Sequence, residues 1–168
     1  NNGQDLWETA YLVRRGDNFG WSVNEGSHPF YPNRKRGPTP IVPPTIEHYH
    51  SEFRSLTGGV VYYGDKLPEL NGAYIYGDYS TGRIWGARHR EGRLVWHQEL
   101  ADTSLQIVAF RVDQHGELLV TDIGGGIYRL IPRPKEVSAA KFPTRLSDTG
   151  LFVSTGDHRV DPGLIPYS

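Results

Sequence analysis

One segment of this sequence occurs twice, and the two copies begin 44 residues apart, at Gly72 and Gly116. In each copy an apolar run ends in an aspartate, Asp78 or Asp122, and a short turn with a glycine leads into a second apolar run. This order is typical of a strand, an aspartate-led turn and a second strand. A repeat of about 40–50 residues built only from short strands indicates the blades of a β-propeller.

Bulk composition excludes several other classes of protein. The chain has 168 residues, a net charge of −1 and no cysteine. We therefore expect no nucleic-acid partner, no disulfide scaffold, no cysteine-ligated zinc and no thiol catalysis. No apolar run approaches the roughly 18 residues of a membrane-spanning helix. With 20 glycines and 12 prolines, the composition fits an all-β, turn-rich chain.

Strands are predicted most clearly after residue 57, where alternating apolar residues are separated by glycine-rich turns. Four of them form a meander and predict one complete blade, and three more predict the start of the next. The predicted strands are 58–63, 73–77, 83–88 and 93–99, then 105–112, 117–121 and 126–131. The tryptophans Trp21, Trp85 and Trp96 are expected to pack between blades rather than to bind sugar.

The two ends of the chain are predicted to be less regular. Strands are predicted at Trp7–Val13 and Phe19–Val23, and the stretch 24–57, with six prolines, is predicted to be an irregular loop. Residues 141–168 show no strand or helix period. We interpret residues 133–168 as an extended tail or as a linker to a downstream module.

The number of predicted blades is too small for a closed ring. About 132 residues divided by the 44-residue period gives roughly three blades, whereas closed propellers have about 4–8. An open arc would expose sheet edges and an apolar blade face. The sequence therefore predicts a partial β-propeller, completed by upstream blades of a longer polypeptide or by other chains.

Four segments of residues 1–132 resemble, in the same order, segments of the glucose/sorbosone dehydrogenase family of soluble quinoproteins. They are Asp5–Glu8 through Gly16-Asp17-Asn18-Phe19-Gly20-Trp21, His50 through Ser55-Leu56-Thr57-Gly58-Gly59-Val60-Val61-Tyr62, Tyr74-Ile75-Tyr76-Gly77-Asp78-Tyr79 through Gly82-Arg83-Ile84-Trp85, and Gly116–Asp122 through Tyr128-Arg129-Leu130. The resemblance implies a six-bladed propeller of which residues 1–132 are the C-terminal blades. It also implies a periplasmic or secreted protein that oxidises a sugar or an alcohol with PQQ and calcium and passes the electrons to a cytochrome-type acceptor.

The resemblance places the catalytic histidine and an Arg-Asn pair in earlier blades, so no catalytic residue is assigned in this chain. Ser80 stands where the family has a cofactor-binding lysine, and Gln106 and Val108 stand on the strand that carries its arginine pair. The family's calcium carboxylate would lie just after Trp7, where this chain has Glu8 and Thr9. The alternative is therefore a propeller that has lost PQQ binding and serves as a non-catalytic binding or scaffolding module.

Five residues are candidates for facing a cofactor or substrate: His50, Arg54, Tyr79, Ser80 and Arg83. His48 and His50 are two residues apart, which is the spacing of a metal pair on one strand face, but an exposed or hydrogen-bonded loop pair is the favoured interpretation. No third ligand is recognisable, so the metal set stays unknown.

The repeated aspartates favour a structural role. We expect Asp78 and Asp122 to bond the backbone of their own tight turns, and Gly82 and Gly126 to supply the permissive position that follows.

Overall fold

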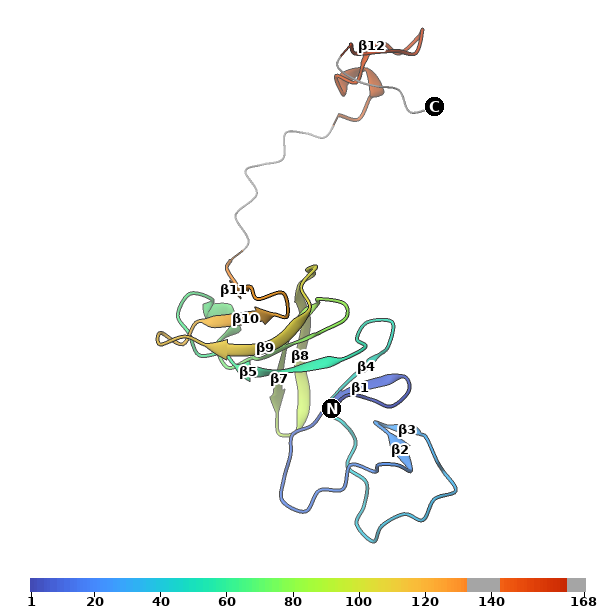
Figure 1. The fold of residues 1–168 in the computed structure, drawn as a ribbon, viewed down its shortest axis with the longest axis vertical. Helices are drawn as coiled ribbons and strands as arrows, with labels where there is room; N and C mark the ends of the chain where they lie inside the picture. Colours follow the sequence, from blue (N-terminus) through green and yellow to red (C-terminus); the bar gives the residue numbers. More distant parts are fainter. Residues whose placement is uncertain (133–142, 163–168) are drawn as a thin grey trace. The chain divides into compact units, whose positions relative to one another are not determined.

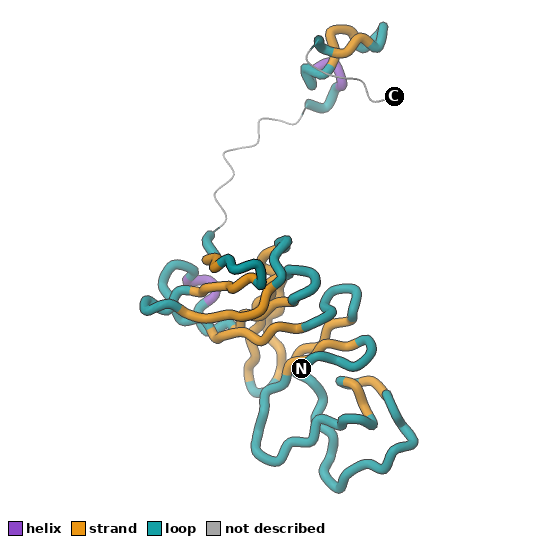
Figure 2. The backbone as a smooth tube through the Cα atoms, viewed as in Figure 1, coloured by secondary structure: helices purple, strands orange, loops and turns teal. Residues whose placement is uncertain are grey.

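The structure, a computed structural model, describes residues 1–132 and 143–162 (Figure 1). The chain divides into two compact units, Asn1–Pro132 and Arg133–Ser168, and each is described by itself. Regular structure in the described residues is β-strand, apart from two short 3-10 helices, Pro68–Leu70 and Leu146–Asp148 (Figure 2). The prediction of an all-β chain is confirmed. None of the described helices has the length and apolar character needed to cross a membrane.

The largest sheet has four antiparallel strands that follow one another along the chain. They are β5 (Leu56–Val61), β6 (Tyr74–Asp78), β7 (Ile84–Arg90) and β8 (Arg93–Ala101). The register pairs Leu56 with Asp78 and Gly77 with Ile84. This is the meander predicted from the sequence, with strand ends shifted by at most two residues. Short connections hold consecutive antiparallel strands side by side.

The second sheet repeats the first three strands of this pattern. It consists of β9 (Ile107–Val112), β10 (Leu118–Asp122) and β11 (Ile127–Arg129), with β10 in the centre. In the described residues no fourth strand pairs with β11.

Each face of the four-stranded sheet packs against a different element. On one face, Ile75 and Ile84 form a buried cluster with residues of the second sheet: Ile107, Phe110, Leu118 and Val120. On the other face, Tyr76 and Ala87 pack against Ile46 and Phe53 from the preceding segment. The alternation of side chains along β6 explains this, since Ile75 points to one face and Tyr76 to the other.

A strand pair covers that second face and corrects the prediction for residues 24–57. Strand β1 (Trp7–Ala10) pairs with β4 (Ile46–Tyr49), which lies inside the stretch predicted to be irregular. A small hairpin, β2 (Asn24–Glu25) with β3 (His28–Pro29), also lies there. The prolines exclude regular structure only locally, and β4 begins just after the last of them.

The predicted strand at Phe19–Val23 is wrong. Gly20 has φ +82° and its N–H donates to Asn18 Oδ1, so the backbone turns at this point. Trp21 is 62% exposed and stacks on Phe30 at 5.2 Å instead of packing between sheets. Trp96 packs against the first buried cluster and Trp85 against the second.

In the second unit, residues 143–162 are not extended throughout. They contain the 3-10 helix Leu146–Asp148 and a hairpin of β12 (Phe152–Ser154) and β13 (Arg159–Val160). The interpretation of 133–168 as a tail or linker stays a prediction, and residues 133–142 and 163–168 lie outside the described residues.

Candidate functional site

The two repeated aspartates organise the same turn in both sheets. Asp78 Oδ2 accepts the N–H groups of Ser80 and Thr81 at 2.9 and 2.7 Å, and Oδ1 accepts those of Arg54 and Ser55 at 2.8 and 2.5 Å. The carboxylate therefore caps its own turn and also anchors the chain that enters β5. The predicted structural role of Asp78 is confirmed.

Asp122 makes the equivalent bonds in the second sheet. Its Oδ2 accepts the N–H of Gly124 at 3.0 Å and its Oδ1 accepts that of Gln106 at 2.7 Å. Backbone bonds repeat as well: Tyr79 N–H donates to Ser55 O, as Ile123 N–H donates to Gln106 O. The second turn is one residue shorter than the first.

That shorter turn corrects one predicted position. Gly82 has φ +71°, as expected for the residue that closes the first turn. In the second turn the left-handed glycine is Gly125, with φ +96°, and not Gly126. A left-handed backbone is costly for residues with a Cβ, which explains the glycine at each place.

Three of the five predicted site residues are brought together by Asp78. Arg54 lies in the loop before β5, and Tyr79 and Ser80 lie in the turn after β6; backbone N–H groups of Arg54 and Ser80 share this carboxylate. The exposed Arg54 side chain makes no ion pair with any described residue, and its Nε donates to His50 O at 3.4 Å. Arg83 is engaged elsewhere, with Glu99 of β8 at 3.6 Å.

His50 contacts a buried carboxylate and does not form a metal-binding pair with His48. Its Nε2 lies 3.1 Å from Oε1 of Glu8, which is fully buried. Glu8 also accepts the N–H groups of Gly3 and Leu56, at 2.9 and 2.7 Å. Within the described residues no group of three or more His, Cys, Asp or Glu has the arrangement of a metal site.

His48 lies in a separate chain of hydrogen bonds that sequence reasoning missed. Its Nδ1 is 3.0 Å from Glu52 Oε2, and its Nε2 is 2.6 Å from the hydroxyl of Tyr76, which in turn is 2.6 Å from His97 Nε2. The carboxylate accepts from Nδ1–H, so the His48 Nε2 accepts from the Tyr76 O–H. The Tyr76 oxygen then accepts from His97 Nε2–H. Four side chains from three strands and a loop thus have one consistent set of donors.

Burial favours the neutral form of His48 and of His97. Desolvation lowers the pKa of His48, while Glu52 opposes the shift. Desolvation, and then the charge of His48, lowers the pKa of His97 to about 4. Burial also raises the pKa of Tyr76. Neutral histidines are consistent with the donors and acceptors described above.

Acid is expected to destabilise the protein through His97. An unfolded histidine titrates near 6.5, whereas folded His97 takes up its proton only at about 4. The unfolded state therefore binds more protons between these values, so stability is complete above pH 6.5 and falls as pH drops toward 4. Allowing for the solvent screening of this half-buried ring, we expect a loss of about 1–2 kcal/mol.

Denaturant unfolding at pH 7 and at pH 4.5 measures this loss. His97→Gln keeps an N–H donor for Tyr76 but does not titrate, so it should remove about 1 kcal/mol of the pH dependence. His115→Gln changes an exposed histidine and is the matched control. Equal pH dependence in the wild type and His97→Gln would contradict the expectation.

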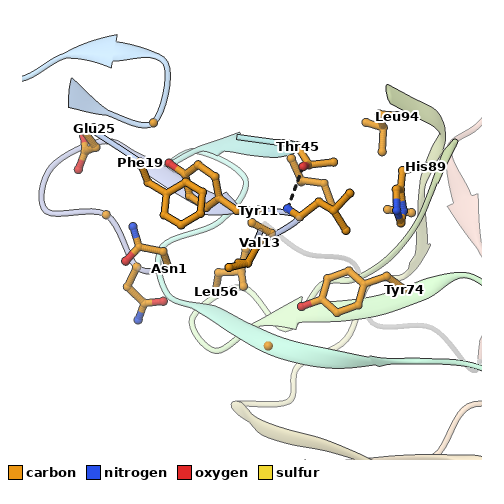
Figure 3. Close-up of a pocket in the computed structure, with 18 of the residues that line it drawn as sticks. Asn1, Tyr11, Val13, Phe19, Glu25, Thr45, Leu56, Tyr74, His89 and Leu94 are labelled. Carbon is orange, nitrogen blue, oxygen red and sulfur yellow. Dashed lines mark hydrogen bonds between the residues drawn. The ribbon is translucent and has the colours of Figure 1, made fainter. Parts of the chain in front are cut away.

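A cleft of about 910 Å³ lies between the β1–β4 pair and the open part of the four-stranded sheet (Figure 3). Tyr11, Val13 and Phe19 line one side, and Leu56 and Tyr74 line the other. None of the five predicted site residues lines it. Sequence reasoning missed the cleft because its walls come from segments distant in the chain.

The residues at the Asp78 turn do not fit PQQ. The three carboxylates of PQQ call for several cationic donors. Arg54 is one cation near this turn, but Ser80, Gln106 and Val108 stand where the resemblance leads one to expect a lysine and two arginines. Both oxygens of Asp78 are occupied by backbone N–H groups, and Glu8 is occupied by two N–H groups and His50. By themselves, the residues of the Asp78 turn and Glu8 therefore do not fit PQQ or calcium.

Comparison with known proteins gives distant relatives. No family model matches the chain. Over 95 residues, 49% of the chain, it is 33% identical to the HIPL1 protein of Arabidopsis thaliana. Over 96 residues, 51% of the chain, it is 28% identical to the HIPL2 protein of the same plant. The match covers 14% of the length of each of these relatives, so the chain corresponds to a small part of them.

Proposed function

We propose that residues 1–132 are the C-terminal blades of a six-bladed propeller of the glucose/sorbosone dehydrogenase type. The observation that carries this proposal is the repeated geometry of Asp78 and Asp122 in two sheets that pack face to face. Successive meanders joined by such packing are the building pattern of a propeller. The resemblance of four segments in the same order supports the same assignment.

The propeller we propose oxidises a sugar or an alcohol with PQQ and calcium and transfers electrons to an acceptor such as a cytochrome. Since the residues of the Asp78 turn do not fit either group, the cofactor contacts in this proposal come from the blades that complete the ring. This chain contributes the substrate-facing rim made by Arg54, Tyr79 and Ser80. A guanidinium without an ion-pair partner suits sugar hydroxyls, because it donates charge-assisted hydrogen bonds to them, while the hydroxyl groups of Tyr79 and Ser80 can both donate and accept.

A non-catalytic binding or scaffolding module is the second candidate. Ser80, Gln106 and Val108 favour it, because they replace the cationic residues that the resemblance leads one to expect. In that case the same rim binds its partner without turnover.

Turnover separates the two candidates. The complete propeller is supplied with PQQ and calcium, and reduction of an electron-acceptor dye is followed with aldoses and alcohols. We expect dye reduction with at least one of them. If no substrate supports dye reduction and the propeller does not bind PQQ, the non-catalytic binding module is the remaining candidate.

Substitution at Arg54 tests the rim under either candidate. Arg54→Ala is expected to weaken sugar binding about 10–100-fold, the value of one charge-assisted hydrogen bond. Arg129→Ala is the matched control, because Arg129 pairs with Asp113 at 2.8 Å, beside the β9–β10 turn. If calorimetry measures the same loss of sugar affinity for both substitutions, Arg54 does not contribute to the sugar-binding site.

A further inference from the structure

We propose that Tyr76 is a redox-active tyrosine, which gives one electron to an oxygen-centred radical while its phenol proton passes to His48. The oxidant is a hydroxyl or peroxyl radical, and the electron reduces it to hydroxide or to a hydroperoxide anion. The proposal rests on the buried hydrogen-bond chain of Glu52, His48, Tyr76 and His97, and it does not depend on a bound cofactor or on sugar binding.

The first observation is a base in direct contact with the phenol proton. Tyr76 is fully buried, and its O–H donates to His48 Nε2 at 2.6 Å. A phenol that has lost an electron is a very strong acid, so it gives this proton to His48 even though desolvation lowers the pKa of that histidine. Burial raises the pKa of Tyr76, and a charged tyrosine would be unpaired in the interior. The electron and the proton therefore leave together.

The second observation is a carboxylate that receives the positive charge. His48 Nδ1–H donates to Glu52 Oε2 at 3.0 Å, and the Glu52 side chain is 45% exposed. A carboxylate in this place fixes the tautomer in which Nε2 is free to take a proton, and it stabilises the imidazolium that forms. The His48 ring is held in position by stacking on Phe53 at 4.0 Å.

The third observation is a second donor to the same phenol oxygen. His97 Nε2–H donates to the Tyr76 oxygen at 2.6 Å. After the transfer, this oxygen accepts from His97 and from the newly protonated His48, so the radical keeps both of its hydrogen-bond partners. The O–H bond of Tyr76 breaks, an N–H bond forms on His48, and the oxidant gains the electron. Return of one electron and of the proton restores the phenol.

The fourth observation is an aromatic contact that joins Tyr76 to the cleft. The Tyr74 ring stacks on Tyr76 at 5.3 Å and 14°, and it lines the cleft (Figure 3). The Tyr74 hydroxyl accepts the N–H of Gly59 at 3.2 Å, and within the described residues no histidine or carboxylate bonds to it. The electron leaves across this stack, and the lasting radical forms at Tyr76, where a base takes the proton.

Tyr62 provides a comparison within the same molecule. It is also fully buried, and its O–H donates to Glu117 Oε2 at 2.7 Å. Glu117 is only 3% exposed, and its other oxygen accepts the N–H groups of Asp65 and Lys66. This pair has no exposed group comparable to Glu52 that stabilises a transferred proton, so we expect no persistent radical at Tyr62.

Flash oxidation of the full chain tests the proposal. The probe is photogenerated tris(bipyridine)ruthenium(III), a one-electron oxidant, and tyrosyl radicals are followed by optical absorption and by electron paramagnetic resonance. We expect a radical that forms more slowly in D₂O and that outlasts the radicals of exposed tyrosines such as Tyr63, which react with one another. Tyr76→Phe should remove the long-lived signal, whereas Tyr62→Phe should keep it.

Substitutions of the base and of its carboxylate test the proton transfer. His48→Gln should slow formation of the radical about 100-fold or more, the value of a positioned general base. Glu52→Gln keeps an acceptor for His48 Nδ1–H but removes the charge that stabilises the imidazolium, so we expect formation to be about tenfold slower, as for one pKa unit. Glu69→Gln changes an exposed carboxylate outside this chain of hydrogen bonds and is the matched control.

A long-lived signal that survives Tyr76→Phe overturns the proposal, and so does the absence of such a signal in the wild type. Equal rates in H₂O and D₂O also overturn it, because the proton would then not move with the electron. If Tyr76→Phe or His48→Gln does not fold, Glu52→Gln and the D₂O comparison decide. The same rate of formation in the wild type and in Glu52→Gln contradicts the assigned route of the proton.

Discussion

Gly59→Ala is expected to destabilise the protein by more than about 4 kcal/mol, a large part of the usual stability of a domain. A Cβ at this position would lie 1.5 Å from Ile75 O and 2.9 Å from the Tyr76 Cα. These neighbours are backbone atoms of the central strand β6, so they cannot move aside without breaking the sheet. The glycine lies in a bulge, because β5 passes from Thr57 to Val60 while β6 passes from Gly77 to Ile75.

The neighbouring glycine is the matched control for this prediction. A Cβ at Gly58 would meet only the Tyr74 hydroxyl, at 4.0 Å. Gly58→Ala should therefore change the stability by less than about 1 kcal/mol. Thermal unfolding should show a midpoint about 10 °C or more lower for Gly59→Ala. Similar midpoints for the two variants would mean that β5 and β6 are not in the register described here.

Asp78→Asn is expected to cost about 3 kcal/mol or more. The carboxylate is fully buried and accepts four backbone N–H groups. The asparagine side chain has the same shape, but its NH₂ group replaces one carboxylate oxygen and leaves two backbone N–H groups without an acceptor. Buried donors without an acceptor each cost about 1–3 kcal/mol.

Asp122→Asn provides the comparison within the same molecule. The Asp122 carboxylate accepts only two backbone N–H groups, those of Gln106 and Gly124, and it is less buried than Asp78. We expect a cost of about 1 kcal/mol from denaturant unfolding. Faster amide exchange of Ser80 and Thr81 in Asp78→Asn would place the damage at the turn. A larger loss for Asp122→Asn than for Asp78→Asn would contradict the proposed role of the first carboxylate.

Local sequence patterns were sufficient to predict the strands wherever consecutive strands are joined by short turns. The four strands of β5–β8 and the three of β9–β11 lie within about two residues of their predicted ends. The aspartate turns were predictable because a carboxylate that bonds N–H groups two and three residues later acts within its own turn. The one-residue difference between the turns was not visible, since any of the three consecutive glycines Gly124, Gly125 and Gly126 could take the left-handed position of the second turn.

The residues around the cleft and the buried hydrogen-bond chain were not predictable in the same way. Tyr76 was expected to belong to a strand, but its place between His48 and His97 depends on elements 28 and 21 residues away. Likewise, the loop prediction for residues 24–57 missed β4, because four residues pair only when β1 is brought alongside them.

The sequence by itself determined that this protein is all-β, with a repeated strand–turn–strand unit whose aspartates hold the turns. Those features depend on contacts within a few residues, which alternation and turn chemistry encode directly. Only the tertiary structure decided that β1 pairs with β4, that His50 contacts the carboxylate of Glu8, and that a cleft lies between the β1–β4 pair and the four-stranded sheet. Such pairings join residues some 40 positions apart, and short polar or proline-rich segments carry no local pattern that specifies their partner.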